Sequence, residues 1–318
     1  MRVFRWIAFF LFLAGAASAA DNDPSLLLKA GRADEALRVL NGSLAQNPND
    51  ARAYHLLCRV YYQLELWDES VRMAEKSIAL DPQNSSYHHW LGRAMGRKAE
   101  VANPFTAFNL ARKVKTEFER AVALDANNLS ARSDLSEFYL EAPSMLGGDK
   151  KKARQQADFV TRQDAALGSY ILARVEEKQA TGRAEAEYKK AVAASPAPSL
   201  YWVELAHFYR RAGRLNDMES AVTQSLATAR NGDATEFDVA NLLLRTGRNF
   251  AGARQMLQHY IVRDNASEDG PVFQAHYLMG TLLERQGRSK EAAQEFQAAL
   301  NMASQYKPAR DALARVSR

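Results

Sequence analysis

Residues 273–306 read FQAHYLMGTLLERQGRSKEAAQEFQAALNMASQY, and this stretch decides the fold. Small and apolar residues recur at spacings of three and four on either side of Gly287, which predicts two amphipathic helices joined by a tight turn. Gly280 lies where the two helices are expected to cross, because a small residue there lets them approach closely. Phe296 and Ala299 share one face of the second helix. The stretch therefore predicts a helical hairpin.

The same design recurs along the chain, clearly at 51–84 and at 199–232. The crossing position of the first helix holds a small residue in successive units, namely Cys58, Gly92, Ser136, Ala206 and Gly280. The second helix presents a small residue at the same crossing, as in Ala36, Ser70, Ala153, Ala253 and Ala292. Similarity at a fixed period indicates a repeat architecture, in which each unit buries its apolar face against its neighbours.

The spacing resembles the tetratricopeptide repeat of about 34 residues, whose signature is W-x₂-L-G-x₂-Y, then A-x₃-F, then A, then P. The resemblance covers nearly the whole chain after residue 20. It implies an all-α, right-handed superhelical solenoid of about seven to eight helix-turn-helix units with a C-terminal capping helix. Such proteins bind peptides or partner helices, so the resemblance implies protein binding without identifying the partner.

The register divides residues 21–318 into successive units. A partial unit occupies 24–50, and full units are expected at 51–84, 85–128, 129–167, 168–198, 199–232, 233–272 and 273–306. Residues 307–318 are expected to form the capping helix that covers the last apolar face. Two units are longer than the period, with the excess at 97–108 and 141–149, between the first and second helix of each. Both loops are thus expected on the same edge of the solenoid. Two roles remain possible for them: binding a partner, or packing on the neighbouring helices.

Residues 1–20 are expected to be a signal peptide. Arg2 and Arg5 precede an apolar run at 6–14, and Ala17-Ser18-Ala19 matches the cleavage pattern of small residues. The run is shorter than the roughly 20 apolar residues that a membrane-spanning helix needs. We expect cleavage after Ala19 or Ala20, a periplasmic or secreted location, and no integral membrane segment after removal of the signal.

The composition excludes several classes of protein. Of 318 residues, 47% are hydrophobic and 25% are charged, as in globular proteins. This composition excludes a wholly disordered chain and a membrane protein with several spans. The 42 Lys and Arg residues exceed the 37 Asp and Glu residues by a margin that is spread along the chain, so no nucleic acid partner is expected. The one cysteine, Cys58, cannot form an internal disulfide and is interpreted as a small packing residue.

No motif for catalysis is found. Phosphate-binding loops, nucleophile elbows and zinc-protease motifs are absent from the sequence. Asp149, before three lysines, is interpreted as a helix N-cap rather than as part of an anion site. His88 and His89 are adjacent and point to different sides of a helix, so they do not form a metal-binding pair. We therefore predict a non-enzymatic protein with no cofactor, no metal and no catalytic residue.

The candidate binding surface is the concave face, which the first helices of successive units line. The resemblance implies that residues two, five, nine and twelve of each first helix contact the partner. At the N-terminal end this selects Arg52, His55, Arg59, Tyr62, His89 and Arg93. This basic and partly aromatic stripe predicts a protein or peptide partner rich in acidic residues. The alternative is that these charges only keep the groove soluble.

The family's carboxylate clamp uses a Lys/Asn pair at residues five and nine, where this chain has His55 and Arg59, so that assignment is in doubt. The function predicted is that of an exported scaffold holding a partner segment in its groove. The alternative function is that of a permanent structural subunit of a cell-envelope or secretion complex. The sequence does not indicate the oligomeric state.

Overall fold

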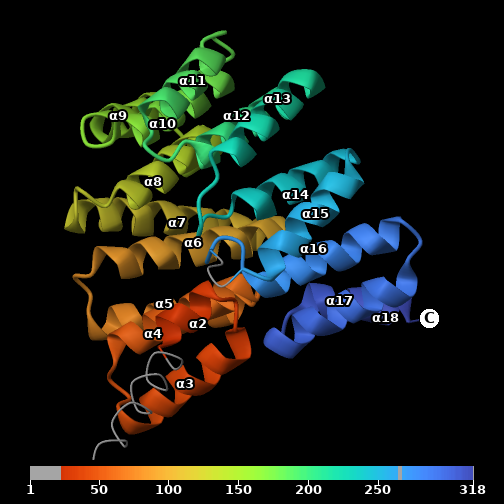
Figure 1. Ribbon diagram of the computed structural model, residues 1–318. Helices are drawn as coiled ribbons and strands as arrows, with labels where there is room; N and C mark the ends of the chain where they lie inside the picture. Colours follow the sequence, from red (N-terminus) through yellow and green to blue (C-terminus); the bar gives the residue numbers. More distant parts are fainter. Residues whose placement is uncertain (1–22, 264–266, 318) are drawn as a thin grey trace, which may run out of the picture.

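The computed structural model describes residues 23–263 and 267–317. Within these residues the regular secondary structure is helical, apart from one isolated bridge between Ser267 and Gly270. Successive helices form antiparallel pairs that stack into a curved array (Figure 1). The protein is thus an all-α repeat solenoid, as predicted. The expected signal peptide, 1–20, lies outside the described residues.

The helix pairs follow one another along the chain with short connections. They are α2 Pro24–Lys29 and α3 Ala33–Gln46, α4 Ala51–Gln63 and α5 Trp67–Leu80, α6 Ser85–Val101 and α7 Pro104–Leu124, α8 Leu129–Glu141 and α9 Lys150–Thr161, α10 Ala165–Lys178 and α11 Ala184–Ala194, α12 Ser199–Arg211 and α13 Leu215–Ala227, α14 Thr235–Thr246 and α15 Phe250–Ile261, and α16 Val272–Arg285 and α17 Ser289–Met302. A short 3-10 helix, η1 Ser144–Leu146, precedes α9, and α18 Lys307–Val316 ends the array.

Side-chain caps set the start of several first helices. Asp50, Asn84 and Asn128 each accept a hydrogen bond from a backbone N–H of the helix that follows, which satisfies a group with no partner inside the helix. Asp164 does the same for α10 through the N–H of Leu167. Helix α10 therefore begins at Ala165, and the unit boundary expected between 167 and 168 is wrong because it falls inside this helix.

The two helices of a pair touch at small residues. A Cβ atom on Gly280 would lie 2.5 Å from the Phe296 ring, and one on Gly92 would lie 2.4 Å from the Phe118 ring, so only glycine fits at these crossings. Cys58 takes the same place in its pair and is fully buried, with the Ser70 hydroxyl donating to its carbonyl oxygen at 2.9 Å. Burial raises the pKa of the Cys58 thiol to about 12, so the thiol stays protonated. Its role here is packing.

The lengthened unit contains the two longest helices of the described chain, α6 with 17 residues and α7 with 21. Asn103 caps α7 and Pro104 occupies its first turn, where the missing N–H of proline has no cost. The loop of the next unit packs on α7, since a Cβ atom on Gly147 would lie 2.7 Å from the Lys115 Nζ atom. Val101 and Phe105 at the α6–α7 turn remain 72% and 79% exposed.

The first and last units are in contact, so the solenoid closes on itself (Figure 1). Leu28 in α2 belongs to the same hydrophobic cluster as Phe273 in α16 and Tyr306 before α18. Gly31 is so close to α16 that a Cβ atom on it would lie 2.6 Å from the Val272 nitrogen. The Ser304 N–H donates to the Asp34 carboxylate at 3.0 Å. The sequence did not predict this closure.

Candidate protein-binding site

All six predicted residues lie on the neighbouring helices α4 and α6. Arg59 and Tyr62 extend from α4 toward Trp90 and Arg93 of α6. His55 also contacts Trp90, with ring centroids 6.1 Å apart. Arg52 is exposed in the first turn of α4, two turns before Arg59. The spacing of three and four residues on a helix is what places these side chains on one face.

Arginine and aromatic side chains alternate on this surface. We call the set the arginine–aromatic ladder; its members are Arg59, Tyr62, Trp67, Trp90, Arg93 and Arg97. The Arg93 guanidinium carbon lies 4.4 Å from the Trp90 ring centroid and 5.1 Å from that of Tyr62. Arg59 lies 5.3 Å from the Trp90 centroid, and Arg97 lies 5.3 Å from the Trp67 centroid. Each such contact contributes roughly 0.5–2 kcal/mol.

Sequence reasoning missed three members of the ladder, Trp67, Trp90 and Arg97. Trp90 and Arg97 are three residues before and four residues after Arg93 on α6, so the helical spacing did contain this signal. Neither residue occupies a groove position of the related family, so the family pattern did not select them. Trp67 is the first residue of α5, the second helix of its pair. Its closeness to the rest of the ladder depends on the conformation of the turn between α4 and α5.

The ladder already holds a carboxylate from the far end of the chain. The Arg59 Nε–H donates to Glu268 Oε1 at 2.9 Å, and a second Arg59 N–H group contacts Glu268 Oε2. The Gln63 side-chain amide donates to the backbone carbonyl oxygen of the same Glu268 at 2.9 Å. The Gln274 amide in turn donates to the Gln63 carbonyl oxygen at 2.9 Å. Glu268, which precedes α16, and Gln274 within α16 therefore contact α4.

One predicted residue, His55, does not have the charge that was expected of it. His55 is buried, and burial together with the nearby Arg59 lowers the pKa of its imidazole to about 3. His55 is therefore neutral at physiological pH, and the prediction that it belongs to a basic stripe is wrong. His89 is buried as well, and its Nε2 atom is hydrogen-bonded to the Asp134 carboxylate at 2.8 Å. The positive charge of the surface comes from its arginines.

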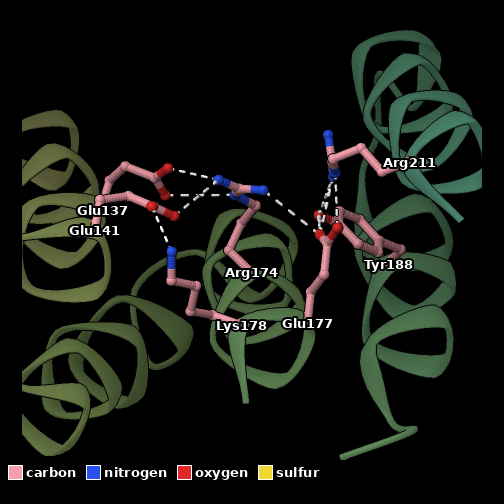
Figure 2. A network of polar contacts seen from close by, with 7 residues as sticks. All are labelled: Glu137, Glu141, Arg174, Glu177, Lys178, Tyr188 and Arg211. Carbon is pink, nitrogen blue, oxygen red and sulfur yellow. Dashed lines mark hydrogen bonds and ion pairs between the residues drawn. The ribbon is translucent and has the colours of Figure 1, made fainter. Parts of the chain in front are cut away.

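A second polar network continues along the first helices of the following units (Figure 2). The Arg174 guanidinium in α10 lies 2.5 Å from the Glu137 carboxylate in α8, and Lys178 lies 2.6 Å from Glu141. On the other side of α10, Glu177 accepts from Arg211 of α12 at 2.7 Å and from the Tyr188 hydroxyl at 2.9 Å. These charges neutralise one another across α8, α10 and α12, so they stabilise the stack.

The C-terminal part of the concave face carries carboxylates with less compensation. Burial, reinforced by the nearby carboxylates of Glu204, Asp269 and Asp233, raises the pKa of Asp238 in α14 to about 7. Burial also raises the pKa of Glu204 in α12, although Arg174 and Arg211 oppose the shift. The interior thus has an acidic side near Asp238 and an arginine-rich side at the ladder, with Asp269 interacting with both.

The described residues contain no group of three or more His, Cys, Asp or Glu side chains that could hold a metal ion. Among the same residues, no helix combines the length and the apolar character needed to cross a membrane.

Stacked helix pairs with small residues at their crossings and a final covering helix define an α-helical repeat protein. Two family models, both described as tetratricopeptide repeat, match residues 27–94 and 237–308. These two parts of the chain are tetratricopeptide repeats. No curated protein is significantly similar to it.

Solved structures with a similar fold include tetratricopeptide repeat proteins. A thermophilic one from Thermus thermophilus is 19% identical, with a TM-score of 0.48, over 58% of this chain and 98% of that chain. One from Parabacteroides merdae is 11% identical, with a TM-score of 0.46, over 96% of this chain and 100% of that chain.

Proposed function

We propose that this protein is an exported, non-enzymatic scaffold that holds an acidic segment of a partner protein on the arginine–aromatic ladder. The observation that carries the proposal is the stacking of Arg59 and Arg93 on Trp90. A guanidinium group stacked on a ring keeps its N–H edge free, and two parallel N–H groups match a carboxylate. The bidentate contact between Arg59 and Glu268 has this geometry, which supports a carboxylate as the group recognised.

The ladder also favours a partner segment with apolar side chains beside its carboxylates. Tyr62 and Trp90 meet edge to face, with ring centroids 5.4 Å apart, and both are only partly buried. Aromatic rings contribute large contact areas at little cost in side-chain entropy. A peptide that places a carboxylate on Arg59 would lay its neighbouring side chains along these rings.

The test compares two labelled peptides, Gly-Ser-Glu-Asp-Gly and its neutral counterpart Gly-Ser-Gln-Asn-Gly, by fluorescence anisotropy. We expect the acidic peptide to bind more tightly and its affinity to fall with salt, because screening weakens ion pairing. Replacing Arg59 and Arg93 together by Gln should reduce this affinity at least about tenfold, the effect of losing about 1.4 kcal/mol of binding. The control variant Arg248→Gln, which loses an ion pair between the α14–α15 turn and Glu219 on α13, should bind as the wild type does. Equal binding of both peptides would contradict the proposal.

Export is part of the proposal and has its own test. The basic start, the apolar run and the small-residue pattern within residues 1–20 support a cleaved signal peptide. N-terminal sequencing of protein recovered from its native host should give a first residue of Ala20 or Asp21. An intact Met1 in the soluble fraction would contradict export to the periplasm or beyond.

The second candidate function is that of a permanent structural subunit of an envelope or secretion assembly. The exposed Val101 and Phe105, together with Met145 at 77% exposure, favour it because they lie on the two inserted turns. A permanent subunit would co-purify with its neighbours in fixed ratio through high salt. Phe105→Asp should then release it, whereas the ladder variants should not.

A further inference from the structure

We propose that Glu268 is a built-in ligand of the ladder, and that an acidic residue of the partner binds by replacing it. This inference rests on the proposed function and adds to it how access to the site is controlled. It also defines the group that the partner must present, namely a glutamate in a non-helical segment whose backbone is accessible.

The contacts to Glu268 are those of a peptide ligand rather than of an isolated ion pair. Arg59 binds the side-chain carboxylate, while Gln63 binds the backbone carbonyl oxygen of the same residue. Recognition of side chain and backbone together is how extended peptides are read by their receptors. The two receptor side chains are one helical turn apart on α4, so they form one site.

The site has a hydrogen-bond acceptor that Glu268 does not use. Gln63 is 6% exposed, and its buried Oε1 atom has no hydrogen-bond partner among the described residues. A buried acceptor without a donor costs free energy that a ligand can recover. A partner peptide could donate a backbone N–H to Gln63 Oε1 while its carbonyl oxygen accepts from Gln63 Nε2. The partner would then make one hydrogen bond more than the built-in ligand does.

Release of Glu268 leaves the closure of the solenoid intact. The closure depends on apolar contacts of Leu28 with the cluster that contains Phe273 and Tyr306, and on the fit of Gly31 against Val272. The segment around Glu268 is held separately on its own unit, where the Tyr260 hydroxyl donates to the Gly270 carbonyl oxygen at 2.6 Å and accepts from the Ser267 N–H at 3.0 Å. Exchange of one carboxylate for another thus needs no rearrangement of the helices.

A ligand that is part of the chain competes at an effective concentration in the millimolar range. The apparent affinity for an outside ligand falls in proportion to the fraction of sites that the built-in ligand leaves empty. The wild-type protein therefore binds a single acidic peptide weakly. A partner with several contacts overcomes this competition, whereas isolated acidic residues of other proteins do not. Glu268 acts as a filter for extended, multivalent partners.

The experiment measures the affinity of labelled Gly-Ser-Glu-Asp-Gly for the full mature chain by anisotropy. Glu268→Gln keeps the size of the side chain and removes the competing charge, so we expect binding about tenfold tighter than that of the wild type. Glu219→Gln is the matched control. It removes a carboxylate on α13 that forms another Arg–Glu pair, with Arg248. That variant should bind as the wild type does. Adding Arg59→Gln to Glu268→Gln should abolish the gain.

The outcomes separate the two proposals. Binding that depends on Arg59 but is equal in the wild type and in Glu268→Gln would overturn the built-in ligand and leave the proposed function standing. Absence of binding in both proteins would overturn the proposed function as well. If Glu268→Gln lost its helical circular dichroism, the shorter Glu268→Asp would replace it, with a gain of at least about twofold expected from the weakened contact. No gain in that variant would also overturn the inference.

Discussion

Gly280 and Phe296 show how a single residue sets the distance between two helices. Phe296 is fully buried, and its ring occupies the space that a Cβ atom on residue 280 would need. We expect Gly280→Val to lower the free energy of unfolding by about 1–3 kcal/mol, the usual cost of overpacking. Thermal and urea melts measure this. Gly42→Val is the control, because nothing lies within 4 Å of that position, and a melting point of Gly280→Val at or above the wild type would contradict the packing described.

The charge of Asp238 affects the pH dependence of stability. Its pKa is about 7 in the folded protein against an ordinary value of 3.8, so the folded state favours the protonated form. Stability is therefore lost as the pH rises from about 4 through 7, where the folded protein must give up a proton that the unfolded chain has already released. Glu204, Asp269 and Asp233 face this carboxyl group and act in the same direction.

We expect Asp238→Asn to be more stable than the wild type by about 1–2 kcal/mol at pH 8, with little difference at pH 4. This figure is below the free energy that corresponds to a rise of the pKa from 3.8 to about 7, because the side chain is partly solvent-accessible and water screens its charge. Urea unfolding at both pH values measures the difference. A gain that was equal at pH 4 and pH 8 would exclude the titration of this group as its cause.

At the scale of helices, the network in Figure 2 joins α8 to α10 through Arg174 and α10 to α12 through Arg211. Arg174→Gln leaves Glu137 without its cation, while Lys178 still pairs with Glu141 and Arg211 with Glu177, so we expect it to destabilise the fold by about 1–2 kcal/mol. The deficit should shrink at high salt, which screens charge interactions. Restoring stability with a second change, Glu137→Gln, would identify the charge pair as the cause, and full additivity of the two changes would refute it.

The helices themselves were largely predictable from the sequence, because the small crossing residues and the turn glycines repeat with the period of the units. The start of α10 was missed although Asp164 is a common type of N-cap residue, since the family register was given precedence over the local capping signal. Within the site, the cluster at Arg59 and Arg93 followed from helical spacing. The neutral state of His55 could not be predicted, because it depends on burial by residues from other units.

At the scale of the whole molecule, the closure was beyond sequence reasoning. Closure depends on the small rotation between each pair of neighbouring units, added up over the whole array. No local sequence pattern indicates the value of this total rotation. The contact between Arg59 and Glu268 is a consequence of closure, so it was equally invisible. Arg59, Tyr62 and Arg93 of the predicted stripe lie near one another, and the carboxylate that contacts Arg59 comes from the other end of the chain.

Phe273 tests the closure directly. It is fully buried in the cluster that joins the first and last units, so Phe273→Ala should cost about 3–5 kcal/mol and increase the radius of gyration measured by small-angle X-ray scattering. Phe105→Ala, the same change at a side chain that is 79% exposed, should alter neither quantity by much. A destabilised Phe273→Ala with an unchanged radius would show that the ends remain joined without this ring.

An open stack of repeats loses its terminal units first, since each end has a neighbour on one side only. Here the contacts of α2 and α3 with α16 and α17 give both ends a second neighbour. Amide protons in α3 and α17 should accordingly exchange with solvent about as slowly as those of the central helices, through global unfolding rather than fraying. The same contacts join residues that are distant in sequence, so refolding should be slower than in an open array of equal length.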